Sequence, residues 1–258
     1  MKIVVLVDNN TYIDVDVGGE PGVSIYLEDE GKSVLLDFGI SDLFLKNAAF
    51  LGVSLDRLSY AVLSHKHYDH TRGLVHWVNH PAAARTPLVA HPACLTKRSE
   101  DGRDIGSPFQ ARELAAALPL QLTTEPLRLT KHIYYLGEIP RVTDFEAGCL
   151  GDDPLPDDSA LACLTPGGLF IVTGCSHAGI CNIIEQAKAV TGEQRVLGVL
   201  GGFHLFGVTD QLRATADYFE REGIRALYPC HCVDFAAKAY LHSRIPIQEV
   251  ASGMELQL

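Results

Sequence analysis

Four side chains of the kinds that bind metal ions lie within six consecutive residues, His65-Lys66-His67-Tyr68-Asp69-His70. In an extended segment, residues two apart project to the same side, so His65 and His67 can bind one ion together. If the chain turns into a helix after His67, Asp69 and His70 project toward a neighbouring position and can serve a second ion. Imidazole and carboxylate ligands suit Zn²⁺ first, with Fe or Mn²⁺ as alternatives. The competing interpretation is a solvated polar loop.

Three later histidines each follow a predicted strand, and they are His177, His204 and His231. We expect His177 and His231 to be further metal ligands. His177 is expected to open the next helix, where the helix dipole favours the neutral imidazole that binds metal. The alternative for His177 is a residue that only caps or packs there. His204 follows Gly201-Gly202, which permit close backbone approach. It is expected to donate a proton to the leaving group or to contact substrate, and a supporting histidine is the alternative.

Cysteines lie beside two of these histidines. Cys175 stands at a strand end, where its thiolate could bind or bridge metal, and as a thiol it would only line the pocket. Cys230 and Cys232 flank His231 and allow a rival interpretation, a thiolate site of the zinc-ribbon sort. A single Cys-x-Cys lacks the second half of such a site.

The elements that must position these residues alternate between strands and helices. The first third predicts strands at 3–7, 23–27 and 33–37, a helix that starts near Ser41 and stops at Gly52, and a strand at 59–64 that leads directly into His65. Regular strand-then-helix units return with strands at 169–173, 196–200 and 226–228. The helices that follow carry apolar faces around Ile183, Ala216 and Phe235–Leu241. Residues from about 100 to 158 form a looser stretch, which we interpret as an inserted, cap-like region. Strands inside, helices outside and histidines at strand ends suggest an α/β fold of the αββα sandwich type, with all 258 residues in one domain.

The motifs together resemble the metallo-β-lactamase superfamily. Within it, the sequence is similar to the dihydropterin-phosphate-synthase-like group, named for an enzyme of the methanopterin pathway. The resemblance covers nearly the whole chain and rests on Asp8–Thr11, Asp37–Gly39, Leu63–His70, Gly137–Arg141, Asp157–Leu161, Thr173–Ile180, Gly201–Leu205 and Pro229–Cys232. The sequence departs from the group's pattern at Phe38, Arg72 and Val233-Asp234, and these departures leave the identity of the substrate open.

The resemblance implies the αββα fold and a site with two divalent metal ions, which spacing alone does not prove. Such a pair lowers the pKa of a shared water and clamps anionic oxygens. Two ions bring about +4 of charge against few anionic ligands, so the site should prefer a phosphate or carboxylate group. We expect Asp69 to orient the nucleophile or to carry its proton, and Asp69 and His204 are the expected catalytic residues.

Composition limits the partners. The formal net charge of −11 disfavours nucleic acid, which needs a basic surface. No segment reaches the roughly 20 apolar residues of a membrane span, and the apolar run at the N-terminus is too short for a signal peptide. The seven cysteines, an odd number, are expected to be reduced thiols. We therefore expect a cytoplasmic protein that acts on a small anionic molecule.

Three functions are compatible with these residues. The leading hypothesis is a metal-dependent phosphoesterase, or a related transferase, acting on a small phosphorylated and pterin-like molecule. The second is a thioester hydrolase of the glyoxalase II kind. The third is a metal-holding sensor or binding module without turnover, although every candidate ligand is present.

Overall fold

The computed structural model describes residues 1–146 and 153–258. Cys149, and Gly151 and Asp152 of the predicted cap-like region, lie outside the described residues. The chain divides into two compact units, each described by itself. Unit 1 consists of residues 1–124, 129–131 and 251–258, and unit 2 consists of residues 125–128 and 132–250.

Unit 1 is built on a mixed β-sheet. Among the described residues this sheet has seven strands, in the order β15-β1-β2-β3-β4-β5-β8. Their bounds are β15 (Glu255–Gln257), β1 (Lys2–Val7), β2 (Ser24–Asp29), β3 (Lys32–Leu36), β4 (Tyr60–Val62), β5 (Leu88–Ala90) and β8 (Leu120–Leu122). The strands from β15 to β3 pair antiparallel, whereas β3, β4, β5 and β8 run parallel. The carboxyl ends of β3, β4 and β5 therefore meet at one edge of the sheet.

Short helices connect the strands of unit 1. They are α1 (Leu43–Phe50), α2 (Tyr68–Thr71), α3 (Leu74–Trp77) and α4 (Ala111–Ala115), with 3₁₀ turns η1 (Ala83–Arg85) and η2 (Pro92–Leu95). A small hairpin pairs β6 (Ser99–Glu100) with β7 (Arg103–Asp104). Helix α1 begins two residues after the predicted Ser41, whose hydroxyl accepts a hydrogen bond from the Leu43 N–H. The core of the unit lies under these helices and includes Phe38, Phe44 and Trp77, all fully buried.

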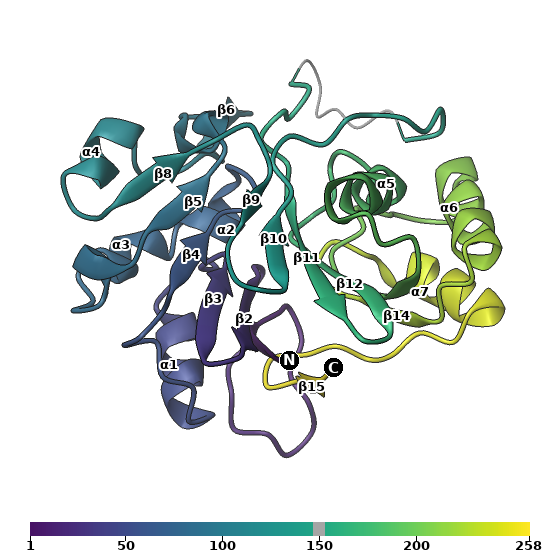
Figure 1. Ribbon diagram of the computed structural model, residues 1–258, viewed down its shortest axis with the longest axis horizontal. Coiled ribbons are helices and arrows are strands. Elements are labelled where there is room, and N and C mark those ends of the chain that lie inside the picture. The colour runs from purple at the N-terminus through teal and green to yellow at the C-terminus, as the bar shows by residue number, and fades with distance from the viewer. Residues whose placement is uncertain (147–152) are drawn as a thin grey trace. The chain divides into compact units, whose positions relative to one another are not determined.

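Unit 2 also has one sheet, which contains six strands among the described residues. The order is β14 (Ala226–Pro229), β13 (Val196–Gly201), β12 (Gly168–Thr173), β11 (Ala160–Thr165), β10 (Ile133–Tyr135) and β9 (Leu127–Arg128). Strands β12, β13 and β14 run parallel, so their carboxyl ends share one edge. Figure 1 shows helices α5 (Ile180–Thr191), α6 (Asp210–Arg221) and α7 (Phe235–Arg244) on one side of this sheet.

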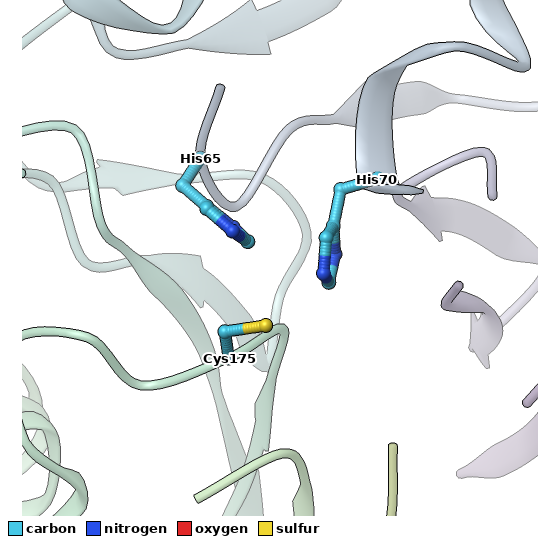
Figure 2. A group of neighbouring side chains, drawn as sticks. All are labelled: His65, His70 and Cys175. Atoms are coloured by element: carbon cyan, nitrogen blue, oxygen red, sulfur yellow. The ribbon is translucent and has the colours of Figure 1, made fainter. Parts of the chain in front are cut away.

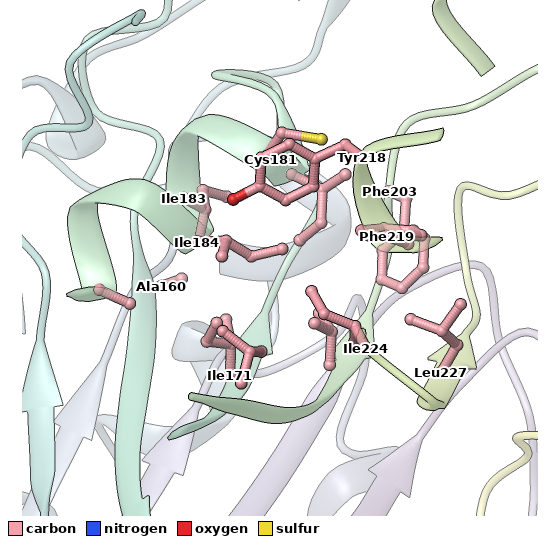
Figure 3. Packing of buried hydrophobic residues seen from close by; sticks show 14 of the residues in the cluster. Ala160, Ile171, Cys181, Ile183, Ile184, Phe203, Tyr218, Phe219, Ile224 and Leu227 are labelled. Atoms are coloured by element: carbon pink, nitrogen blue, oxygen red, sulfur yellow. The ribbon is translucent and has the colours of Figure 1, made fainter. Parts of the chain in front are cut away.

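Apolar side chains fill the space between that sheet and its helices. In Figure 3, Ile183 and Ile184 of α5 and Phe219 of α6 point toward Ile171 and Leu227 of the strands. All five are fully buried. Burial of apolar surface contributes roughly 25 cal/mol per Å² to stability. It is the main force that holds the strand ends in place.

The predicted strands and helices in both units are confirmed, with shifts of a few residues at their ends. Residues from the predicted cap-like region also join the sheets as β8, β9 and β10, while its role as a cap stays a prediction. Among the helices of the described residues, none combines the length and apolar character needed to cross a membrane.

Candidate metal centre

The His65–His70 segment lies at the carboxyl end of β4, as predicted. His67 has an extended backbone, with φ −60° and ψ 145°, and stands directly before helix α2. The Nε2 atom of His65 lies 3.1 Å from Nδ1 of His67, so the two imidazoles converge as expected for residues two apart. The rings of His65 and His70 also meet, with centroids 4.2 Å apart (Figure 2). Unit 1 therefore brings three imidazoles together.

A buried network orients two of these rings. Asp37, at the carboxyl end of β3, accepts a hydrogen bond from the Ser64 N–H at 2.8 Å and lies 2.7 Å from His70 Nδ1. The Ser64 hydroxyl lies 2.8 Å from Nδ1 of His65. Metal-binding histidines commonly donate one ring N–H to such a partner, which leaves the other ring nitrogen for the metal. His65 and His70 fit this arrangement through Nε2.

Asp69 stands in the first turn of α2 and is partly exposed. Its Oδ2 atom lies 3.8 Å from Nε2 of His70. The predicted turn into a helix after His67 is confirmed, and it carries Asp69 and His70 to neighbouring positions.

In unit 2, ligand atoms gather around Cys175, which follows β12 and is drawn in Figure 2. The Sγ atoms of Cys175 and Cys232 and a ring nitrogen of His231 all lie within 4.8 Å of one another. The predicted candidates Cys175 and His231 are thus together, and Cys232 joins them. From the sequence, Cys232 is expected only as part of a zinc-ribbon site, although it stands next to the candidate ligand His231.

The pKa of the Cys232 thiol is lowered. Burial alone would raise this pKa, but hydrogen bonds with Cys175 and His204 and the electrostatic effect of the neighbouring His231 outweigh burial and hold it well below the usual value. A thiolate is the form of cysteine that binds metal.

His177 and His204 form a second contact in unit 2, with ring centroids 4.3 Å apart. The prediction that His177 opens the next helix is wrong. Helix α5 begins at Ile180, after Gly179 with φ 98°, so His177 lies in the loop and not in the first helical turn. Nδ1 of His204 is buried and has no hydrogen-bond partner among residues 1–146 and 153–258. A buried nitrogen without a partner is costly in the folded protein and points to a bound group.

Asp158, which belongs to the Asp157–Leu161 motif, supports the His177 loop. Its Oδ2 atom accepts a hydrogen bond of 2.7 Å from the Ala178 N–H. Burial raises the pKa of Asp158 to about 7, helped by the neighbouring Asp157, while the N–H groups of Ala178 and His177 oppose this shift. Asp158 thus acts on the site through the backbone that carries His177.

Several of these loops hold strained backbone. Asp37, Ser176, His204 and His231 have φ between 49° and 60°, in the left-handed region that non-glycine residues rarely adopt. Such conformations cost about 1–3 kcal/mol each and persist where the surroundings fix them. All four lie at or next to a candidate ligand or its hydrogen-bond partner.

The donor set in each unit fits divalent metal ions. Unit 1 offers imidazoles with a carboxylate, and unit 2 offers imidazoles with thiols, which are the ligand types of zinc and iron sites. His91, at the carboxyl end of β5, has one ring nitrogen engaged by the backbone, because its Nδ1 accepts a hydrogen bond from the Ala93 N–H. It therefore caps η2.

Comparisons with known proteins agree with this geometry. The sequence profile of the metallo-beta-lactamase superfamily matches residues 17–145. The uncharacterized protein MJ0448 of Methanocaldococcus jannaschii is 32% identical over 91% of this chain and 91% of its own length. The 7,8-dihydropterin-6-methyl-4-(beta-D-ribofuranosyl)-aminobenzene-5'-phosphate synthase of the same organism is 26% identical over 92% of this chain and 89% of its own.

A solved structure is also similar over the full length. Tm1679, described as a metal-dependent hydrolase of the beta-lactamase superfamily, matches with a TM-score of 0.84 and 27% identity, covering 100% of this chain and 99% of its own. The chain therefore belongs to the metallo-β-lactamase superfamily and has its mixed α/β fold. Proteins of this fold generally bind divalent metals.

Proposed function

We propose that this protein is a dinuclear metal-dependent hydrolase, or a related transferase, that acts on a small phosphorylated molecule. Both units supply metal ligands in this proposal. The proposed ligands are His65, His67, Asp69 and His70 from unit 1, and Cys175, His177 and His231 from unit 2, with Cys232 added from the structure. Zinc is the proposed metal.

The observation that carries the proposal is the orientation of the unit 1 imidazoles. Asp37 and Ser64 engage Nδ1 of His70 and His65, so both rings turn Nε2 toward the same space. A structural histidine cluster has no need of a carboxylate that fixes the tautomer, whereas a metal site does.

Charge supports an anionic substrate. A pair of divalent ions supplies hydroxide at neutral pH and offsets negative charge on a phosphoryl group. Two divalent ions bring about +4 of charge against the Asp69 carboxylate, the Cys232 thiolate and one hydroxide, so with Cys175 as a neutral thiol the site keeps about one positive charge within a protein of net charge −11. That overall charge disfavours polynucleotides, and a small molecule is proposed for this reason.

Two residues have proposed catalytic roles. The Asp69 carboxylate, 3.8 Å from His70 Nε2, orients the attacking nucleophile or accepts its proton at Oδ2. His204 donates a proton to the leaving group through Nδ1, the buried nitrogen that has no partner among the described residues. A pterin-like substrate is favoured by the name of one relative, which is a dihydropterin phosphate synthase.

Turnover on a substrate panel tests the proposal. Phosphodiester, phosphomonoester and thioester substrates are compared for the zinc-loaded wild type, His67→Ala and Asp69→Asn. We expect hydrolysis of a phosphoester by the wild type and a loss of at least about 100-fold in both variants. Turnover confined to the thioester would replace phosphoester chemistry with the glyoxalase II alternative, and equal rates in all three proteins would remove the catalytic assignment.

A further inference from the structure

A hollow in unit 1 lies directly beside the His65–His70 segment. It has a volume of about 450 Å³ and is lined by Tyr68, Arg72, Arg103, Asp104 and Ile105. Tyr68 stands between the candidate ligands His67 and Asp69. Arg72 follows Tyr68 by one helical turn, about 6 Å along the axis. The hollow therefore adjoins the segment that carries the candidate ligands of unit 1.

Two chain segments form and fix this hollow. The Tyr68 N–H donates a hydrogen bond of 3.0 Å to the Ile105 carbonyl, which ties α2 to the segment after the β6–β7 hairpin. The Arg72 guanidinium lies over the Tyr68 ring, 4.7 Å from its centroid, and reaches the Asp104 carbonyl at 3.5 Å. The stacking on tyrosine restrains the guanidinium of Arg72, which is one of the residues that line the hollow.

The charges in the hollow favour an anion. Arg103 is exposed, and its guanidinium has no side-chain partner in the part of the chain that the structure describes. Asp104 is the one acidic lining residue among those described, and its Oδ1 atom accepts a hydrogen bond from the Gly106 N–H. Among the residues that line the hollow, two guanidiniums stand against one carboxylate, although the protein as a whole has a net charge of −11. The guanidinium fork matches phosphate oxygens in pairs.

We propose that Arg72 and Arg103 form a subsite that binds a second phosphate group of the substrate, one that does not react. The inference rests on the proposed function, because it names a part of the same substrate. It also gives a role to Arg72, one of the positions where this sequence departs from the pattern of the family group it resembles. A substrate with two phosphates would be held at both ends, with one phosphate at the metals and the other between the arginines.

Binding of inorganic phosphate tests the subsite without any need for turnover. Nitrogen-15 NMR of the zinc-loaded protein follows the Nε–H signals of Arg72 and Arg103 and the Tyr68 amide during a phosphate titration. We expect saturable shifts of these signals, about tenfold weaker binding in Arg72→Gln and in Arg103→Gln, and an intermediate affinity in Arg72→Lys. Binding should also weaken in high salt, because both groups are exposed.

The controls separate this subsite from the metals. Arg213→Gln removes an arginine that also lies over a tyrosine, Tyr240 at 5.5 Å, but on helix α6, and should bind phosphate as the wild type does. His67→Ala disturbs the metal ligands and should leave the Arg72 and Arg103 shifts in place. A Tyr68 amide shift that persists unchanged in the Arg72→Gln/Arg103→Gln double variant, or arginine shifts that vanish in His67→Ala, would overturn the subsite. Equal affinity for acetate would overturn its assignment to phosphate.

Kinetics distinguish failure of the subsite from failure of the proposed function. A nucleoside bisphosphate and the matched monophosphate are compared as substrates. In Arg103→Gln, which leaves the stack on Tyr68 intact, KM should rise about tenfold for the bisphosphate with kcat unchanged, and the monophosphate should be unaffected. An equal change in KM for both substrates would contradict the subsite. Absence of all turnover would contradict the proposed function, and the phosphate titration would then decide on the subsite.

Discussion

The Asp37 carboxylate lies 2.7 Å from Nδ1 of His70, and both side chains are fully inaccessible to solvent. The same Asp37 oxygen also accepts a hydrogen bond from the Ser64 hydroxyl at 2.6 Å. Because Asp37 follows β3 and His70 lies in α2, this pair joins two strand ends of unit 1. It fixes which nitrogen of His70 is available to a metal.

Asp37→Asn should weaken metal binding. If the amide oxygen keeps the Ser64 N–H, the amide NH₂ faces His70, and Nε2 must then carry the imidazole proton. We expect a loss of about 10–100-fold in zinc affinity, measured by competition with a chelator. Asp56→Asn is the matched control, because Asp56 lies 3.8 Å from His80 in an exposed carboxylate–histidine pair. An Asp37→Asn protein that binds zinc as tightly as the wild type would contradict the assigned orientation.

Gly202→Ala should damage the ligand cluster of unit 2. A Cβ atom at Gly202 would lie 2.4 Å from Cys232 Sγ and 2.6 Å from the Gly174 carbonyl, too close for either contact. We expect reduced zinc content and at least about tenfold lower activity, with the fold retained by circular dichroism. Gly167→Ala controls for the change of residue, because a Cβ atom there would make only ordinary contacts, the nearest at 3.4 Å with Leu197. Unchanged zinc content in Gly202→Ala would show that the cluster does not bind metal.

The raised pKa of Asp158 predicts a pH dependence of stability. A carboxyl whose pKa increases on folding, here from about 4 to about 7, binds its proton more tightly in the native state. This stabilising contribution is complete below pH 4 and is lost as the pH rises through 7. The free energy of unfolding therefore falls over that range. Urea unfolding of the metal-free protein measures it. Asp158→Asn should flatten the slope between pH 4 and 7, and an identical slope in both proteins would contradict the assignment.

The ion pairs of Lys188, away from the candidate ligands, are expected to contribute to the free energy of unfolding. Its Nζ atom lies 2.6 Å from Glu222 and 3.0 Å from Glu185, and the side chain is 8% exposed. Lys188→Met leaves two partly buried carboxylates without their cation and should lower the free energy of unfolding by about 1–3 kcal/mol. In the exposed pair of Lys46 and Asp42, Lys46→Met should cost less than about 0.5 kcal/mol. Equal effects of the two substitutions in urea unfolding would contradict this reasoning.

The sequence predicts the fold well because its signals are local. Strong apolar runs mark the strands, and the spacing of His65 and His67 within an extended segment is enough to predict that their rings converge. Gly201-Gly202 likewise predict close backbone approach, and the structure places Gly202 against Gly174. Each of these features depends on residues near one another in the chain.

Other parts of the site depend on residues far apart in the sequence. Asp37 meets His70 because β3 and β4 pair in the sheet, and no spacing rule gives that partner. Asp158 supports Ala178 across β11 and β12, and Cys232 reaches Cys175 across the parallel edge of unit 2. The loop position of His177 was missed because the left-handed Gly179 delays the helix, and a glycine does not reveal its φ in the sequence.

Metal content of the purified protein tests the central claim most directly. The claim is that ligands from both units hold two divalent ions, so the wild type should contain about two ions per chain by elemental mass spectrometry. His67→Ala in unit 1 and His231→Ala in unit 2 should each contain clearly less. Fewer than about one ion per wild-type chain after gentle purification, or full metal content in both variants, would contradict the account.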